Sequence, residues 1–84
     1  MSKSYILASD LGSGSCKTVI LDGAGRVAGS AGEEYPTFYP QPGWVEQDPE
    51  AWRRAFVQTV RRVLAETGIP ASEIALIGLV GVTH

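Results

Sequence analysis

A short run of residues near the start of the chain limits the possible folds most strongly. Residues 5–9 are an apolar segment that leads to Asp10, residues 12–15 are a turn rich in glycine and serine, and a second apolar segment follows at 17–22. Two such segments around a short turn predict a β-hairpin. Backbone N–H groups in such a turn can hold an anion, and an aspartate that ends a strand can hold a divalent cation. The pattern therefore indicates a site for a nucleotide phosphate and Mg²⁺.

The next elements are marked by turn signals. A second turn at 22–25 leads into a strand of small residues at 26–34, which we expect at an edge of the sheet. The first three strands then form an antiparallel meander. Residues 35–47 include three prolines and are predicted to be an irregular loop.

A helix is predicted over 48–67. Asp48 suits the N-cap, Pro49 suits the first helical position, and Gly68 suits the end of the helix. The predicted buried face has helical spacing and consists of Trp52, Ala55, Phe56, Thr59, Val60, Val63 and Leu64. The four arginines at 53, 54, 61 and 62 fall outside this face, so we expect them in solvent.

The last segment, 74–82, is apolar on both faces, which is typical of a central strand covered on two sides. One helix covers only one side of a sheet, so we expect chain beyond His84 to cover the other. The sequence therefore predicts an α/β fold with a mixed sheet, a β-β-β-α-β start of an N-terminal domain that is incomplete here.

Charge and composition narrow the functional classes. The chain has 84 residues and a net charge of −2, which gives no electrostatic basis for binding nucleic acid or an anionic membrane. We find no secretory signal and no run approaching the roughly 20 apolar residues of a membrane span, so we expect a cytoplasmic protein. The single cysteine, Cys16, suits a small buried position in a strand.

Two nucleotide-binding motifs are nearly matched but fail. Lys17-Thr18 could end a P-loop, but Cys16 replaces the required glycine, Leu11 stands at the first glycine position, and a strand follows instead of a helix. Residues 23–28 match a dinucleotide-binding fingerprint, yet no helical pattern follows to receive a pyrophosphate. A glycine hairpin is the better interpretation of 23–28.

Three segments together resemble a known family. The Asp-x-Gly-Ser-x-Ser-x-Lys sequence at 10–17 resembles the first phosphate motif of the sugar kinase, Hsp70 and actin superfamily. Residues 42–52 (PGWVEQDPEAW) look like the loop-to-helix segment of FGGY carbohydrate kinases, and 78–84 (GLVGVTH) is similar to the Gly-x-x-Gly-x-x-His of xylulokinases. The resemblance implies a ribonuclease-H-like fold with a second domain that lies outside this chain.

The resemblance also implies roles for individual residues. Asp10 is expected to organise Mg²⁺, and His84 to bind a hydroxyl of the substrate. The nucleotide phosphates are assigned to four hairpin residues, Gly12, Ser13, Ser15 and Lys17. The general base is expected beyond residue 84. In the 42–52 segment we expect structural roles for Trp44, Glu46 and Asp48.

The implied activity is transfer of the γ-phosphate of ATP to a hydroxyl of a ketose or polyol, with ATP and Mg²⁺ as cofactors. Glycerol kinases have Asn-Gln-Arg-Glu where this chain has Val82-Thr83-His84, which favours a xylulokinase-like substrate, although xylulokinases usually have Gln-Met-His there. The expected partner is a small-molecule sugar or polyol, and a homodimer of the full-length parent is one option. We expect the 84-residue chain alone to be inactive.

Two alternatives remain at this point. An Hsp70-like or actin-like ATPase would share the hairpin, but the segment at 42–52 argues against it. A non-catalytic interaction module would associate through its uncovered sheet, and the isolated chain would then self-associate or bind a hydrophobic dye.

Overall fold

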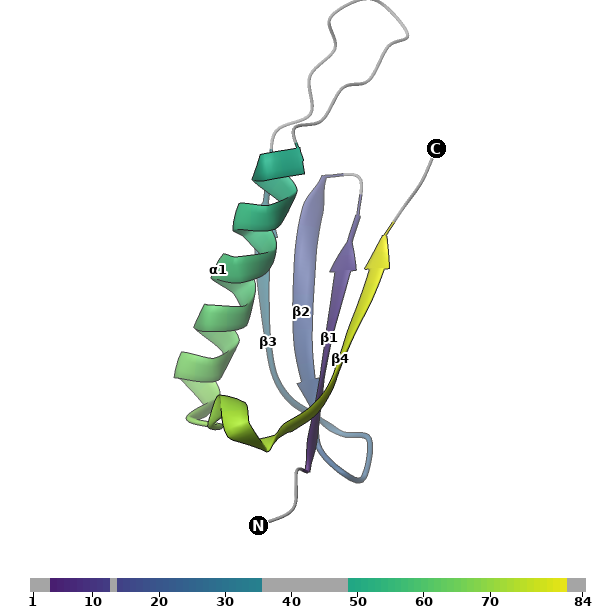
Figure 1. Cartoon of the computed structure of the whole chain (residues 1–84), viewed down its shortest axis with the longest axis vertical. Helices are drawn as coiled ribbons and strands as arrows, with labels where there is room; N and C mark the ends of the chain where they lie inside the picture. The colour runs from purple at the N-terminus through teal and green to yellow at the C-terminus, as the bar shows by residue number, and fades with distance from the viewer. Residues whose placement is uncertain (1–3, 13, 36–48, 82–84) are drawn as a thin grey trace, which may run out of the picture.

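The computed structural model describes residues 4–12, 14–35 and 49–81. One helix packs on one face of a four-stranded sheet (Figure 1). The elements, in chain order, are β1 (Tyr5–Leu11), β2 (Ser15–Leu21), β3 (Val27–Glu34), α1 (Pro49–Thr67), the short 3₁₀ helix η1 (Ala71–Glu73) and β4 (Ile74–Gly81).

The strands lie in the order β3-β2-β1-β4. The first three form the predicted antiparallel meander, and β4 adds to β1 in parallel, so the sheet is mixed as expected. Because β3 runs parallel to β4, α1 connects two parallel strands by a crossover over β2 and β1. Within the described residues β4 is an edge strand. The central position expected for it requires further chain and stays a prediction.

The first hairpin is longer and tighter than the sequence suggested. Pairing continues to Leu11 opposite Cys16, beyond the predicted strand end at residue 9, and β2 already begins at Ser15. Backbone hydrogen bonds do not depend on side-chain polarity, so the polar residues next to the turn do not end the ladder. The strand ends were therefore predicted less well than the strands themselves.

The core lies between α1 and the β2–β3 half of the sheet. One of its buried clusters consists of Leu7, Ile20, Ala31 and Val63. The predicted apolar face of the helix points to this core, with Ala55, Thr59 and Val63 buried. The helix ends as predicted at Gly68, whose positive φ of 73° suits glycine and whose N–H donates to the Leu64 carbonyl at 2.9 Å. The predicted N-cap, Asp48, lies outside the described residues.

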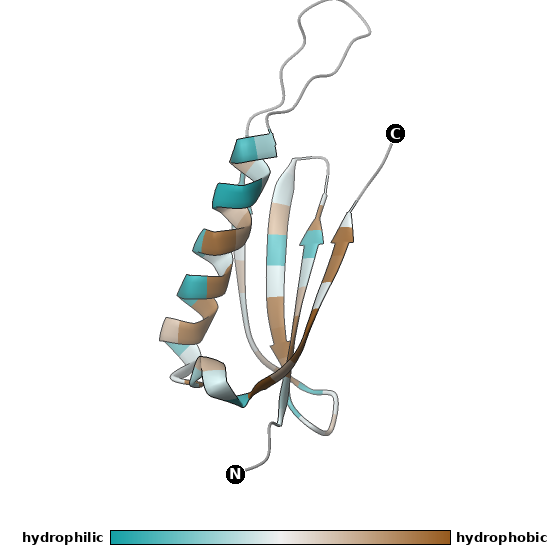
Figure 2. Ribbon diagram, in the orientation of Figure 1, coloured by the Kyte–Doolittle hydropathy of each residue, from teal (hydrophilic) through white to brown (hydrophobic). Residues whose placement is uncertain are grey.

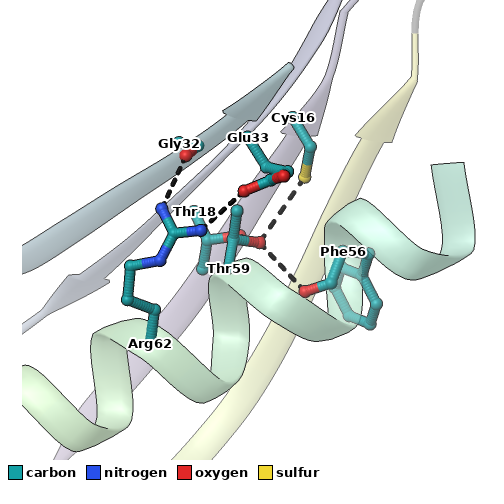
Figure 3. Close-up of polar contacts among 7 residues, drawn as sticks. All are labelled: Cys16, Thr18, Gly32, Glu33, Phe56, Thr59 and Arg62. Atoms are coloured by element: carbon teal, nitrogen blue, oxygen red, sulfur yellow. Dashed lines mark hydrogen bonds and ion pairs between the residues drawn. The ribbon is translucent and has the colours of Figure 1, made fainter. Parts of the chain in front are cut away.

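A chain of buried hydroxyls joins the sheet to the helix, and Figure 3 shows its two threonines, Thr18 and Thr59. Ser9 and Thr18 are 2.6 Å apart, and Thr18 lies 2.7 Å from Thr59. Because Thr59 donates its proton to the Phe56 carbonyl, Thr18 must donate to Thr59 and Ser9 to Thr18. Each of these three hydroxyls thus has a hydrogen-bond partner. The position of α1 on β1 and β2 is therefore fixed by directional hydrogen bonds as well as by apolar contacts.

Cys16 is fully buried, as predicted for a small apolar residue, with its sulfur 3.7 Å from the Thr59 hydroxyl. The four helical arginines are exposed, also as predicted. Arg62 additionally reaches back to β3, where it donates to the Gly32 carbonyl at 2.7 Å and pairs with Glu33 at 2.6 Å (Figure 3). Among the described residues, no helix has the length and apolarity to cross a membrane.

Candidate functional site

Asp10 and Lys17 lie opposite one another on β1 and β2 and are both exposed. Their neighbours Ser9 and Thr18 are buried and linked to Thr59 on the helix. Because successive side chains of a strand point to opposite faces, Asp10 and Lys17 share the face that α1 does not cover. The structure therefore places a carboxylate and an ammonium group side by side on an open surface, next to the turn.

The hairpin turn lies at the end of the sheet where β1 and β4 both have their carboxyl ends (Figure 1). On β4, Val80 is the partner of Asp10, and Gly81 is the partner of Leu11. Ligands of open α/β sheets bind outside the carboxyl ends of the strands, which is where this pair lies. The predicted substrate residue His84 follows β4 by three positions and lies outside the described residues.

The two glycines of the turn differ in the space around them. The Gly12 N–H donates to the Ser15 carbonyl at 2.8 Å. A Cβ on Gly12 would lie 3.3 Å from that same carbonyl oxygen, whereas a Cβ on Gly14 would meet nothing within 4 Å. The Ser15 side chain belongs to an exposed residue, and Ser13 lies outside the described part of the chain. A side chain at position 12 would thus crowd the turn more than one at position 14, and the predicted phosphate role of Gly12 stays a prediction.

Asp10 suits a magnesium ion that is shared with a phosphate. Among the described residues no group of three or more histidine, cysteine or acidic side chains could hold a metal ion. Mg²⁺ keeps several waters and is usually held by one or two carboxylates together with substrate phosphate oxygens. One exposed carboxylate beside the β1–β2 turn is compatible with that mode of binding.

Sequence reasoning missed Tyr35, which was placed at the start of the irregular loop. The structure buries this residue to 7% exposure, and its hydroxyl donates to the carbonyls of Gly12 and Ser15, the latter at 2.9 Å. Burial raises the pKa of the Tyr35 phenol, and the nearby Cys16 and Asp10 raise it further. A usable signal existed, because alternate positions of β3 face the helix and residue 35 continues that alternation beyond the strand.

Residues 5–84 match the model of the FGGY family of carbohydrate kinases, N-terminal domain. The chain belongs to this family. The match decides against the Hsp70-like or actin-like alternative, because it extends over the hairpin, the helix and the last strand together.

Curated relatives of this FGGY chain include glycerol kinases. It is 42% identical over 79 residues to the glycerol kinase of Symbiobacterium thermophilum, covering 94% of this chain and 16% of that protein. It is 45% identical over 76 residues to the glycerol kinase of Methylibium petroleiphilum, covering 89% and 15%. The chain therefore spans about one sixth of the length of these relatives.

Solved structures show the same arrangement of elements. A xyloylose kinase from Brucella ovis has a TM-score of 0.89 at 35% identity over 95% of this chain and 17% of its own. A gluconate kinase from Lactobacillus acidophilus has a TM-score of 0.82 at 26% identity, covering 92% and 15%. A xylulose kinase from Rhodospirillum rubrum, at 20% identity and a TM-score of 0.83, covers 95% and 16% and supports the fold alone. The predicted ribonuclease-H-like fold, present here as part of a domain, is confirmed.

Proposed function

We propose that the protein containing this chain transfers the γ-phosphoryl group of ATP to a hydroxyl of a sugar or polyol, and that residues 5–22 bind the nucleotide phosphates. The observation that supports this is that Asp10 and Lys17 are cross-strand neighbours on the open face of the hairpin. Phosphoryl transfer depends mainly on positioning and on stabilising negative charge. A carboxylate for a cation and an ammonium group for phosphate oxygens are the two charges that such a site needs.

The proposed roles are those that the resemblance to the FGGY family implies for each residue. Gly12 lets the backbone approach the phosphates, and Ser13 and Ser15 donate hydroxyl hydrogen bonds to phosphate oxygens. Lys17 neutralises charge that develops on the transferred group. Asp10 would hold Mg²⁺, and the ion would supply positive charge that stabilises the phosphate oxygens.

The acceptor is proposed to be a ketose or polyol that is contacted by His84. The comparisons support two different acceptors. The curated relatives named above are glycerol kinases, whereas a structural neighbour at 35% identity is a xyloylose kinase. Val82-Thr83-His84 supports the ketose. We also propose that the general base is contributed from beyond residue 84 and that the 84-residue chain alone is inactive. The parent is proposed to work in the cytoplasm, with a homodimer as one option.

The test uses the complete polypeptide encoded by the reading frame that contains this chain. ATP turnover is measured with glycerol, xylulose and gluconate, and we expect one ketose or polyol to stimulate it. Asp10→Ala should lower the stimulated rate by at least about a hundredfold, since removal of one electrostatic contact to a transition state costs that much.

Asp22→Asn is the matched control, because Asp22 lies at the opposite end of β2 and an asparagine oxygen can still accept hydrogen bonds from the N–H groups of Ala24 and Arg26. We expect Asp22→Asn to leave turnover within about twofold of the parent, because a surface substitution of this kind changes little. Full turnover in Asp10→Ala, or no acceptor-stimulated turnover in the complete protein, contradicts the proposal.

A further inference from the structure

Tyr35 contacts the hairpin turn through two of its polar groups, the side-chain hydroxyl and the backbone N–H. Its hydroxyl lies against the carbonyl oxygens of Gly12 and Ser15, and its backbone N–H donates to the Gly14 carbonyl at 3.1 Å. A phenol has one proton, so the two carbonyls share it. One residue thus engages three carbonyl groups of the turn.

The Tyr35 ring is held on the side of the sheet that the helix covers. It belongs to a buried cluster with Cys16, Ala51 and Ala55, so it lies between the hairpin and the first turns of α1. Asp10 and Lys17 point to the opposite face. Tyr35 therefore cannot touch a ligand bound beside that pair and can act on it only through the backbone of the turn.

The turn has little else to hold it within the described residues. A single backbone hydrogen bond, from the Gly12 N–H to the Ser15 carbonyl, closes it. Gly14 has open space around its Cα, and glycine has the largest conformational freedom of any residue. A phosphate site made of backbone N–H groups requires a fixed turn, because each loss of alignment weakens a hydrogen bond.

We propose that Tyr35 is a positioning residue of the phosphate-binding hairpin: its hydroxyl fixes the Gly12 and Ser15 carbonyls and thereby sets the turn for the nucleotide. The expected effect on nucleotide binding rests on the proposed function, whereas the expected effect of the Tyr35 hydroxyl on the turn does not. Burial keeps the phenol protonated, so it remains a donor throughout the neutral range.

The experiment compares Tyr35→Phe with Tyr5→Phe in the complete protein. Both variants lose one hydroxyl and keep a ring in a partly or fully buried place, but Tyr5 packs against the Leu7 cluster and has no hydrogen bond to the turn. Amide hydrogen exchange of residues 12–17 is measured first, without nucleotide. We expect exchange about three- to tenfold faster in Tyr35→Phe, the effect of one lost hydrogen bond, and no change in Tyr5→Phe.

Steady-state kinetics with MgATP form the second measurement. The KM for MgATP should rise about three- to tenfold in Tyr35→Phe while the KM for the acceptor stays within twofold, because the hairpin contacts only the nucleotide. Unchanged exchange overturns the inference, and so does faster exchange with an unchanged KM for MgATP or an equal rise in both KM values.

The two proposals fail in different ways. A wild-type protein without acceptor-stimulated turnover contradicts the proposed kinase activity, and the exchange experiment still decides whether Tyr35 fixes the turn. An active wild type with normal kinetics in Tyr35→Phe contradicts the role of Tyr35 alone.

Discussion

The two halves of the sheet differ in what covers them, and the β1–β4 half, which the helix covers less, is the more apolar of the two. In the β2–β3 half, α1 packs on one face and buries Ile20 completely. In the β4 strand at the other edge, the side chains on both faces are largely exposed, although Figure 2 shows it as a hydrophobic strand. The exposed large side chains there are Leu76, Ile77, Leu79 and Val80, each at 59–62% exposure.

The difference teaches that burial in this chain is decided by the position of the helix and not by the composition of the strands. Ile77 is the β4 partner of Leu7, so it points to the same face as the buried core, yet the helix lies too far across the sheet to cover it. Clusters of exposed apolar side chains on a soluble protein usually mark a surface that another segment or partner covers. The candidate site lies where the two halves meet, on the β1–β2 hairpin.

The largest expected effect on stability comes from replacing one isoleucine by alanine in each half of the sheet. Ile20→Ala should lower the free energy of unfolding by about 2–5 kcal/mol, because it leaves a cavity under the helix. Ile77→Ala in the 84-residue chain should change it by no more than about 0.5 kcal/mol, since Ile77 is 60% exposed. Urea denaturation of both variants measures the contrast.

The same pair then reports on what covers β4. In the complete protein the cost of Ile77→Ala should rise towards that of Ile20→Ala if further chain packs on this strand. Equal costs already in the 84-residue chain would mean that the chain covers β4 by self-association, which analytical ultracentrifugation would detect, and the contrast drawn here would be wrong.

A second, smaller effect is expected from adding a methyl group to a glycine in each half. A Cβ on Gly29 of β3 would lie 2.3 Å from the Thr67 methyl carbon and 3.3 Å from a Val63 methyl carbon. The Thr67 side chain is held by its hydrogen bond to the Val63 carbonyl, so it cannot rotate freely. Gly29→Ala should therefore destabilise the protein by about 1–3 kcal/mol.

Gly78→Ala on β4 is the matched control, since a Cβ there meets nothing within 4 Å. It should be neutral or stabilising by up to about 1 kcal/mol, because alanine reduces the freedom of the unfolded chain. Thermal unfolding monitored by circular dichroism separates the two variants. A destabilised Gly78→Ala would show that this side of β4 is already covered.

The smallest expected effect concerns the β2–β3 turn, where backbone N–H groups are hydrogen-bonded to a side chain of the turn itself. The backbone N–H groups of Arg26 and Ala24 both donate to the Asp22 carboxylate. The pKa of Asp22 is lowered from 3.8, mainly because of the hydrogen bond from the Arg26 N–H. Because the folded state favours the charged form of Asp22, this carboxylate makes its full contribution to stability at pH values above its ordinary pKa of 3.8. That contribution is lost as the pH falls through the lower pKa of the folded state.

We therefore expect a slight loss of stability confined to acid below about pH 3.8, which Asp22→Asn should remove. An NMR titration of the Asp22 side-chain carboxyl carbon measures the pKa directly. An unshifted pKa would mean that this turn, like the β1–β2 turn, depends on contacts from elsewhere in the fold.

Much of the fold and part of the site could be predicted from local patterns. The hairpin, the mixed sheet and the helix end at Gly68 follow from alternation, turn residues and helical spacing. Asp10 and Lys17 were predicted through a family motif, and their placement on one face follows from their register across the turn. Ser13 and His84 lie outside the described residues, so their roles stay proposals.

The contacts of Tyr35 and of the hydroxyl chain could not be predicted in this way. The alternation of β3 could place Tyr35 on the helix side of the sheet, but its hydrogen-bond partners are 20 and 23 residues away in sequence. Thr18 and Thr59 are 41 residues apart and meet only when the helix docks. Contacts between distant residues leave no periodic signal in a single sequence.

The sequence by itself determined the elements and their order, because turns, caps and periodicity act over a few residues. It also determined, through motifs spread over 10–17, 42–52 and 78–84, the family to which the chain belongs. Only the tertiary structure decided which apolar residues are buried, since that depends on where α1 lies on the sheet. It alone also placed Tyr35 behind the β1–β2 turn, because that contact exists only after β3 has paired with β2.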